Sequence, residues 1–407
     1  MKEISFIHAA DLHLDSPFKG LAHTPNHIFQ EIVESTFVSL DRLVAVAIQK
    51  EVDFVLIVGD LFDNEKQSLK AQIQLRKAFE ELKRHNIEVY LSYGNHDFIN
   101  GNLHPVTYPD NVHIFENVTV SHFTYKKRNE ALANIYGFSY ENRAVTDEKA
   151  KEFKVINHDI PFHIATLHGS IQSNTDHDVY APFQLSELQK EPFDYWGLGH
   201  IHKREVLKEN PFVVYPGNIQ GRNRKETGQK GCYHVVLSET DSVLTFIPLN
   251  TITFQPVQVD LTNCENLHQA ERLIQETINN DRQIAGKTLI DLSLTGDFVL
   301  KQWENAKQIE ELIEIINQMI SQDQQWKYIF HFTTNIKRKN LDAELKKGEH
   351  FIGEVIRQAE KMDLQKSIQD LYLHKQARRY LHSVSLEDQQ VMKEEAKELL
   401  LNELLKG

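Results

Sequence analysis

The chain has 407 residues and a formal net charge of −13, with 41% hydrophobic and 25% charged residues. This length suits two or three domains, and the acidic balance argues against binding nucleic acid through bulk charge alone. No apolar run approaches the roughly 18 to 20 residues that a membrane-spanning helix needs, and two cysteines, Cys232 and Cys264, supply neither a disulfide framework nor a cysteine-based zinc site.

The first 100 residues alternate short apolar runs with longer amphipathic segments. The apolar runs, rich in β-branched and aromatic residues, predict buried strands at residues 4–10, 53–58 and 87–93. Residues 27–50 and 67–85 carry apolar side chains at helical spacing. This alternation predicts a parallel or mixed sheet with right-handed crossovers. Because no cleavable signal pattern precedes the first strand, we expect a cytoplasmic protein.

Residues 111 to 260 consist of short apolar segments separated by polar turns, which predict a second sheet packed on the first. Beyond them, a helix–strand–helix–strand pattern predicts a small α/β cap, and from Gly348 onward the pattern is helical. The predicted strands of the second region are residues 118–122, 134–138, 163–168, 195–199, 212–215, 233–237 and 243–248. The predicted cap elements are residues 265–281, 288–294, 306–321 and 327–333.

Together these elements predict an α/β fold in which two packed mixed β-sheets are flanked by helices. A small α/β cap domain and a helical C-terminal tail complete the prediction. We place the catalytic domain at residues 1–255, the cap at 256–340 and the helical segment at 341–407.

Polar motifs follow the carboxyl ends of five predicted strands, which is where ligands gather in open α/β sheets. Carboxylate, imidazole and amide side chains suit Mn²⁺, Zn²⁺ or Fe²⁺, and the single carboxylate of Asp60 could bridge two such ions. An ordinary turn or surface loop explains any one motif alone, whereas all of them together favour a two-metal site. The candidate ligands are Asp11, His13, Asp60, Asn95, His168, His200 and His202.

In this order, the motifs resemble those of the calcineurin-type metallophosphoesterase superfamily. The longer strings at residues 11–15, 59–63 and 215–218 resemble more narrowly the SbcD-like DNA double-strand-break repair nucleases, and among them the bacterial YhaO-type exonucleases. The resemblance covers residues 1 to about 250. It implies the metallophosphoesterase sandwich and a DNA exonuclease or endonuclease with two divalent ions, Mn²⁺ foremost, with Zn²⁺ or Fe²⁺ as alternatives.

The resemblance also implies a role for each residue. His96 would protonate the leaving oxygen as a general acid, and Asp97 would orient that imidazole. Asp63 resembles a supporting residue beside the ligands, although a carboxylate that caps its loop explains it equally well. Many family members have a histidine near position 223, where this chain has Asn223, so no catalytic role is assigned there. One ion would be held by Asp11, His13, Asp60 and His202, and the other by Asp60, Asn95, His168 and His200.

Seven basic residues stand against three acidic ones between Lys203 and Lys230, directly after the last candidate ligands. This excess predicts contacts with the phosphate backbone of DNA, which position nucleic acid without reading its sequence. A solvated basic loop is the alternative. The candidate DNA-binding residues are Lys203, Arg204, Arg222, Arg224 and Lys225.

Apolar stripes recur at helical spacing near the C-terminus. They either cover the protein's own core or, as the resemblance implies, dock an SMC-like ATPase of the YhaN or SbcC type as a helix in a groove. A homodimer through the first helices is a further expectation from the resemblance. The stripes consist of Leu364, Ile368, Leu371 and Tyr372, followed by Leu399, Leu400, Leu404 and Leu405.

Three functions compete for this sequence. The first is a Mn²⁺-dependent DNA nuclease of a repair complex, which the basic segment, the cap and the helical tail favour. The second is a small-molecule phosphodiesterase or phosphatase with the same site, which a narrow closed pocket would favour. The third is a non-catalytic DNA-binding scaffold, against which the presence of His96 and all seven ligand residues argues.

Overall fold

The computed structural model describes residues 2–63, 67–101, 106–172, 180–336 and 351–363, together with the single residues 366, 389, 392, 393, 396 and 400. The chain forms two compact units. Unit 1 comprises Met1–Val257, Thr277–Leu292 and Ile316–Phe332, and unit 2 comprises Gln258–Glu276, Ser293–Ile315 and Thr333–Gly407. None of the described helices is long and apolar enough to cross a membrane.

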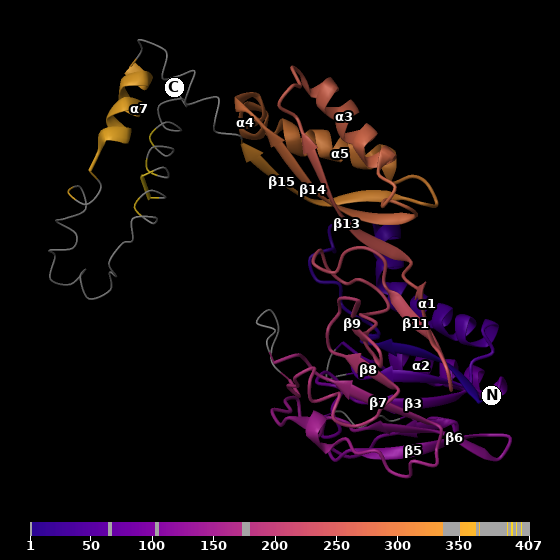
Figure 1. The fold of residues 1–407 in the computed structure, drawn as a ribbon. Coiled ribbons are helices and arrows are strands. Elements are labelled where there is room, and N and C mark those ends of the chain that lie inside the picture. The colour runs from indigo at the N-terminus through magenta and orange to yellow at the C-terminus, as the bar shows by residue number, and fades with distance from the viewer. Residues whose placement is uncertain are drawn as a thin grey trace. The chain divides into compact units, whose positions relative to one another are not determined.

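The first sheet of unit 1 has six strands in the order β12-β11-β1-β2-β3-β4, and Figure 1 labels β3 and β11 of this sheet. Neighbouring strands from β1 to β4 are parallel, whereas β11 pairs antiparallel with β1 and β12 antiparallel with β11. All five residues of β2 are buried, as an apolar run in a central parallel strand requires. The strands are β1 (Glu3–Ala10), β2 (Phe54–Val58), β3 (Glu88–Ser92), β4 (Val112–Ile114), β11 (Gly231–Ser238) and β12 (Ser242–Pro248).

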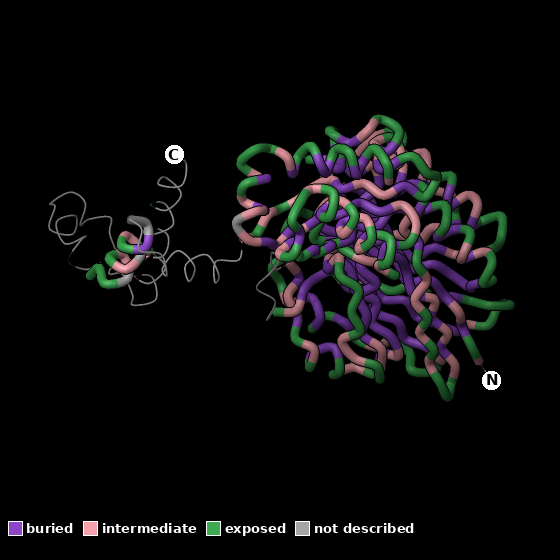
Figure 2. The backbone as a smooth tube through the Cα atoms, turned by 90° about the horizontal axis from the view of Figure 1, so that it is seen from above, coloured by how far each residue is buried: buried purple, intermediate pink, exposed green. Residues whose placement is uncertain are grey.

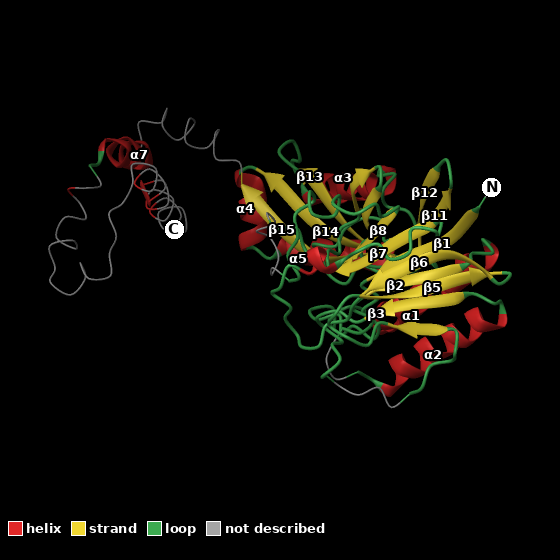
Figure 3. Ribbon diagram, turned by 60° about the horizontal axis from the view of Figure 1, so that its bottom comes forward, coloured by secondary structure: helices red, strands yellow, loops and turns green. Residues whose placement is uncertain are grey.

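Two helices cover one face of this sheet. They are α1 (Asn26–Gln49) and α2 (Leu69–Arg84), and Figure 3 shows α2 beside β3. The side chain of Ser68 starts α2 by accepting a hydrogen bond from the Ala71 amide at 3.0 Å. Apolar residues of both helices pack with Ile7 and Ala9 of β1 in one core cluster, so burial of this face holds the layer together.

The opposite face of the first sheet packs against a second six-stranded sheet of order β5-β6-β7-β8-β10-β9. Phe6 of β1 and Phe54 of β2 share a core cluster with Ile164 and Tyr195 of the second sheet. The interior strands of this sandwich are buried along most of their length (Figure 2). The strands are β5 (Ser121–Lys127), β6 (Glu130–Gly137), β7 (Phe162–His168), β8 (Tyr195–Gly199), β9 (Glu205–Glu209) and β10 (Phe212–Tyr215).

A third sheet has the order β13-β14-β15, and its strands contribute residues to both units. The short 3-10 helix η1 (Lys149–Glu152) belongs to unit 1, and α7 (Phe351–Lys361) belongs to unit 2. The elements of the cap region are β13 (Ile252–Asp260), α3 (Leu267–Asn280), β14 (Lys287–Gly296), α4 (Phe298–Asn305), α5 (Gln308–Ile320) and β15 (Lys327–Ile336).

The predicted fold class is confirmed: two mixed sheets pack together with helices outside them. Two details were wrong. The strands predicted at residues 233–237 and 243–248 exist, but they extend the first sheet, because β11 pairs with β1 rather than with a strand of the second sheet. The strand predicted at residues 118–122 lies instead at Ser121–Lys127, where β5 pairs with β6.

Other differences concern helices and strands that the spacing of apolar residues did not distinguish from the neighbouring segments. The strands β4, β9 and β13 and the helix α4 were not predicted. The predicted helix at residues 306–321 begins at Gln308, because Lys307 has a left-handed φ of +58° that separates α5 from α4. The predicted helical tail contains α7, whereas Leu364, Ile368, Leu371, Tyr372, Leu399, Leu404 and Leu405 lie outside the described residues.

Candidate metal centre

The predicted ligands lie just beyond the carboxyl ends of strands in both sheets of the sandwich. In the first sheet, β1, β2 and β3 lead into Asp11, Asp60 and Asn95. In the second, His168 ends β7 and His200 follows β8. The His200 amide donates to both carboxylate oxygens of Asp11, at 3.0 and 3.1 Å, and so joins the end of β8 to the end of β1.

Asp11, His13, Asp60 and His202 form a compact group that we call the first cluster. One possible ligand atom from each lies within 4.8 Å of those of the other three. His13 Nε2 is 3.0 Å from His202 Nε2 and 3.8 Å from Asp60 Oδ2. Two carboxylates and two imidazoles at this separation suit one divalent cation.

Asp60, Asn95, His168 and His200 form a second cluster, which shares Asp60 with the first. His168 Nε2 is 3.0 Å from Asn95 Oδ1 and 3.5 Å from Asp60 Oδ2. His200 Nδ1 is 3.2 Å from the same Asn95 oxygen. Because Asp60 Oδ2 approaches imidazoles of both clusters, one carboxylate is placed to serve two cations.

Hydrogen bonds fix which nitrogen faces the clusters in two of the histidines. The Nδ1 atom of His168 lies 3.1 Å from the Val58 carbonyl oxygen, and that of His202 lies 2.9 Å from Glu226 Oε1. Both partners can only accept, and the Glu226 oxygen is nearer to His202 Nδ1 than the Arg222 Nη2 at 3.2 Å, so each Nδ1 carries the proton and each neutral Nε2 presents a lone pair. Lone pairs that converge with carboxylates are unfavourable unless a cation lies among them. The residues therefore fit divalent metal ions.

Burial determines the protonation states of these groups. It lowers the pKa of His13, His168 and His202, so that their rings stay neutral and able to bind a metal. Burial and then the charge of Asp60 raise the pKa of Asp11. Burial acts in the same direction on Asp60, but the neighbouring histidines, first His168, outweigh it and lower the pKa. A bound cation would relieve the repulsion between the two carboxylates.

Several of these residues have a backbone conformation that side chains rarely adopt. The φ angles of Asp11, His13, Asp60 and His200 are +52°, +43°, +51° and +95°. Left-handed conformations cost non-glycine residues roughly 1–2 kcal/mol each, and such strain concentrates at functional sites. The surrounding sandwich holds the loops in shapes that the sequence pattern alone did not predict.

Two glycines allow the ligands to approach the backbone. A Cβ atom at Gly59, where φ is +76°, would lie 2.2 Å from His168 Nδ1. A Cβ atom at Gly94 would lie 2.3 Å from Asp60 Oδ1. Both positions must lack a side chain if His168 and Asp60 are to keep their places.

The predicted proton donor His96 lies beside the first cluster. Its ring is 5.1 Å from that of His13, and its Nδ1 donates to the main-chain oxygen of Asp63 at 2.8 Å. The carboxylate of Asp97 instead accepts from the amides of Leu61 and Gly94, at 2.6 and 2.7 Å. Burial raises the pKa of Asp97 to about 8. The hydrogen bond predicted for Asp97 thus goes to Asp63, and Asp97 joins the loops after β2 and β3.

The predicted DNA-binding residues fall into two groups. Lys203, Arg204, Arg224 and Lys225 are exposed, and the guanidinium of Arg204 lies 3.7 Å above the ring of Phe246. Arg222 is largely enclosed: its side chain is 14% exposed and donates to the carboxylates of Asp63 and Glu226. The first four side chains are open to solvent, whereas the guanidinium of Arg222 already has internal partners.

Three residues that support the ligands were not predicted from the sequence. Glu226, which counted only as an acidic residue of the basic segment, bonds to the imidazole of His202. Lys230 is buried and its Nζ donates to the His202 carbonyl oxygen at 2.9 Å. The hydroxyl of Tyr140 donates to the His168 carbonyl oxygen at 2.8 Å. Their sequence spacing gave no signal, because each contact depends on the tertiary fold.

Comparison with known proteins agrees with this geometry. The profile of the Calcineurin-like phosphoesterase family matches residues 4–204. The chain is 36% identical over 408 residues to YhaO of Bacillus subtilis (strain 168), described as an uncharacterized metallophosphoesterase, and the match covers 99% of this chain and 98% of the relative.

More distant relatives carry the name DNA double-strand break repair protein Mre11. The one from Sulfolobus acidocaldarius is 21% identical over 364 residues, which cover 87% of this chain and 89% of the relative. The one from Methanocaldococcus jannaschii is 27% identical over 289 residues, which cover 67% of this chain and 74% of the relative.

Proposed function

Because this chain belongs to the calcineurin-like phosphoesterase family, we propose that it is a two-metal-dependent nuclease that cleaves phosphodiester bonds in DNA during double-strand-break repair. The observation that carries the proposal is the meeting of the two clusters at Asp60, from which one carboxylate oxygen approaches His13 at 3.8 Å and His168 at 3.5 Å. Relatives named for DNA double-strand break repair support the choice of DNA as substrate.

The two clusters would each hold one divalent ion. When bound, such ions would offset the charge of the phosphate and lower the pKa of water. Oxygen and imidazole ligands accept Mn²⁺, Zn²⁺ and Fe²⁺, and we propose Mn²⁺. In this assignment the first ion takes Asp11, His13, Asp60 and His202, and the second takes Asp60, Asn95, His168 and His200.

His96 would act as the general acid. Since its Nδ1 donates to the main-chain oxygen of Asp63, the ring is held with Nε2 toward the reaction, and in the imidazolium form Nε2 would hand its proton to the departing oxygen and leave a neutral ring. Asp97 would support this group indirectly, by fixing the loop at Gly94. Asp63 would contribute through its carbonyl oxygen and through the ion pair of its carboxylate with Arg222.

DNA would approach along the exposed basic residues that follow the last ligands. Lys203, Arg204, Arg224 and Lys225 are exposed, so they can contact phosphates without first breaking a buried ion pair. Such contacts carry no sequence information, which suits a nuclease that acts on ends of any sequence. A small phosphodiester bound at the metal centre would not reach these residues. Contacts with them would therefore favour DNA over a small phosphodiester as the substrate.

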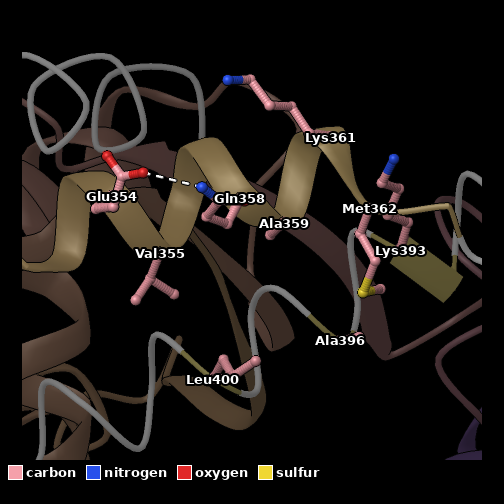
Figure 4. A pocket seen from close by; sticks show the side chains of 9 residues that line it. All are labelled: Glu354, Val355, Gln358, Ala359, Lys361, Met362, Lys393, Ala396 and Leu400. Atoms are coloured by element: carbon pink, nitrogen blue, oxygen red, sulfur yellow. Dashed lines mark hydrogen bonds between the residues drawn. The ribbon is translucent and has the colours of Figure 1, made fainter. Parts of the chain in front are cut away.

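A partner of the SMC-like ATPase type would dock on the C-terminal helical segment. Unit 2 has a cavity of about 560 Å³ between α7 and residues 393, 396 and 400. Figure 4 shows Val355 and Ala359 on the side of α7 that faces Ala396 and Leu400. This apolar lining suits a helix-in-groove contact.

Three further parts of the proposal rest on the sequence. The domain division is a catalytic domain at residues 1–255, a cap at 256–340 and a docking segment at 341–407. A homodimer is expected through the first helices, and the proposed location is the cytoplasm.

The experiment that tests the function uses the full chain with Mn²⁺ and two substrates, end-labelled duplex DNA and bis-p-nitrophenyl phosphate. A DNA nuclease degrades the duplex and also hydrolyses the small phosphodiester. Hydrolysis of the small phosphodiester alone would assign a small-molecule phosphodiesterase. DNA binding without hydrolysis of either substrate would assign a scaffold.

A further inference from the structure

Glu226 lies directly behind a predicted metal ligand. Its Oε1 accepts from His202 Nδ1 at 2.9 Å, and on the other side of that ring Nε2 lies 3.0 Å from His13 Nε2. Two ligands at right angles, each about 2.1 Å from one ion, are separated by about 3 Å. The two imidazoles are therefore spaced as ligands of a single ion, with Glu226 on the far side of one of them.

The carboxylate of Glu226 is itself held rigidly. Its Oε2 accepts from the Asn218 side chain at 2.7 Å and from the Arg222 amide at 2.8 Å. The guanidinium of Arg222 lies 3.3 Å from Oε1. Glu226 is only 8% exposed, so water cannot replace these donors. A buried carboxylate with this many donors has one position available to it.

Arg222 connects the carboxylate of Glu226 with that of Asp63, which lies behind His13. Its Nη1 donates to Asp63 Oδ1, and the same oxygen lies 3.7 Å from His13 Nδ1. Each imidazole of the first cluster thus has a carboxylate behind it, and a single guanidinium joins the two carboxylates. This arrangement places the guanidinium of Arg222 beside the first cluster.

We propose that Glu226 is a positioning residue that holds His202 with Nε2 facing the first cluster, and that Arg222 locks Glu226 in that position. The inference rests on the proposed function, because it assumes that the first cluster holds a metal ion. A carboxylate that accepts from a histidine ligand fixes the tautomer and the ring orientation, and its loss typically weakens metal binding 10- to 100-fold.

The test is calorimetric titration of the metal-free full chain with Mn²⁺, combined with counting of bound ions after dialysis. Glu226→Ala should weaken binding of one of the two ions about 10- to 100-fold and leave the other unchanged. Glu226→Gln keeps an acceptor without the charge, so it should restore part of the affinity. Glu209→Ala, at an exposed glutamate at the end of β9, is the control and should bind both ions like the wild type.

The outcomes separate this inference from the function beneath it. If the wild-type chain binds no Mn²⁺, the proposed function and the inference both fail. If the wild type binds two ions and Glu226→Ala binds them with unchanged affinity, only the inference fails. Should Glu226→Ala unfold, Glu226→Gln decides: weaker binding of one ion supports the positioning role, and unchanged binding of both overturns it.

Discussion

The Nε2 atoms of His13 and His202 lie 3.0 Å apart, although 189 positions separate these residues in the chain. His13 follows a strand of the first sheet and His202 a strand of the second. The neutral Nε2 of His202 presents a lone pair here, because its Nδ1 donates to Glu226. The packing of the two sheets therefore brings together side chains that fit a divalent cation.

The roles proposed for His96 and His200 predict different losses on substitution. His96→Ala should keep both metal ions and lose about 10²- to 10⁴-fold in rate, the usual contribution of general-acid catalysis. His200→Ala removes a ligand of the second cluster and should lose the corresponding ion. Elemental analysis of the dialysed proteins, with rates on bis-p-nitrophenyl phosphate, distinguishes the two. Equal metal loss in both variants would place His96 among the ligands.

Gly59→Ala should damage the metal site without touching any ligand directly. The added Cβ would meet His168 Nδ1 at 2.2 Å, so the imidazole must move away from the second cluster. Gly20→Ala is the matched control, since Gly20 has a similar φ of +87° but a Cβ atom there would meet no atom within 4 Å. Both variants should lose about 1–2 kcal/mol to left-handed strain.

Both variants should share this loss of folding stability, but only Gly59→Ala should also lose metal affinity. Thermal unfolding measures the strain in the two variants, and Mn²⁺ titration measures the effect on the site. Equal metal affinity of the two variants would show that His168 is not needed where the structure places it.

The exposed basic residues predict how DNA binding depends on salt. Replacing Lys203, Arg224 and Lys225 by alanine should weaken binding and reduce the slope of log K against log salt by about 1 for each phosphate interaction that is removed. Lys77, Lys83 and Arg84 on α2 form the control, because they are equally exposed but lie on another element. An unchanged slope in the first variant would move the DNA path elsewhere.

Buried His8 predicts a pH-dependent stability. Burial lowers the pKa of His8 to about 3, so the folded chain keeps the ring neutral where the unfolded chain, with a pKa near 6.5, binds a proton. Below pH about 6.5 the unfolded state therefore binds more protons than the folded state. As the pH is lowered further, the free energy of unfolding should fall by about 1.4 kcal/mol for each pH unit.

His8→Gln should remove this part of the slope. His268→Gln, at a side chain that is 87% exposed, should leave it unchanged. Urea unfolding of the metal-free proteins between pH about 7 and about 5, on either side of the ordinary histidine pKa, measures the difference. Equal slopes for wild type and His8→Gln would contradict a neutral buried ring.

The sequence predicted the parts of the fold that depend on local pattern. The strands around Ile4, Val55 and Tyr195 are short runs in which apolar residues predominate, and the ligand motifs follow them directly. The local sequence does not show which sheet a strand joins. The strand β11 belongs to the first sheet because it pairs with β1, which lies some 230 residues earlier in the chain. Very short strands, such as the one at residues 112–114, gave too brief a pattern to separate from a turn.

The site shows the same limit at the level of single residues. Ligand types and their order identified the clusters, but the partner of His96 depends on where the Asp63 carbonyl points. The contact between Glu226 and His202 depends on the course of the loop after β10. Neither contact has a sequence period, so both required the tertiary structure.

The most direct test of the two-metal centre is a crystal structure of the Mn²⁺-soaked protein with anomalous diffraction data. We expect two anomalous peaks, one among Asp11, His13, Asp60 and His202 and one among Asp60, Asn95, His168 and His200. A single peak elsewhere, or none at either cluster in a crystal that contains Mn²⁺, would contradict a site in which Asp60 serves two ions.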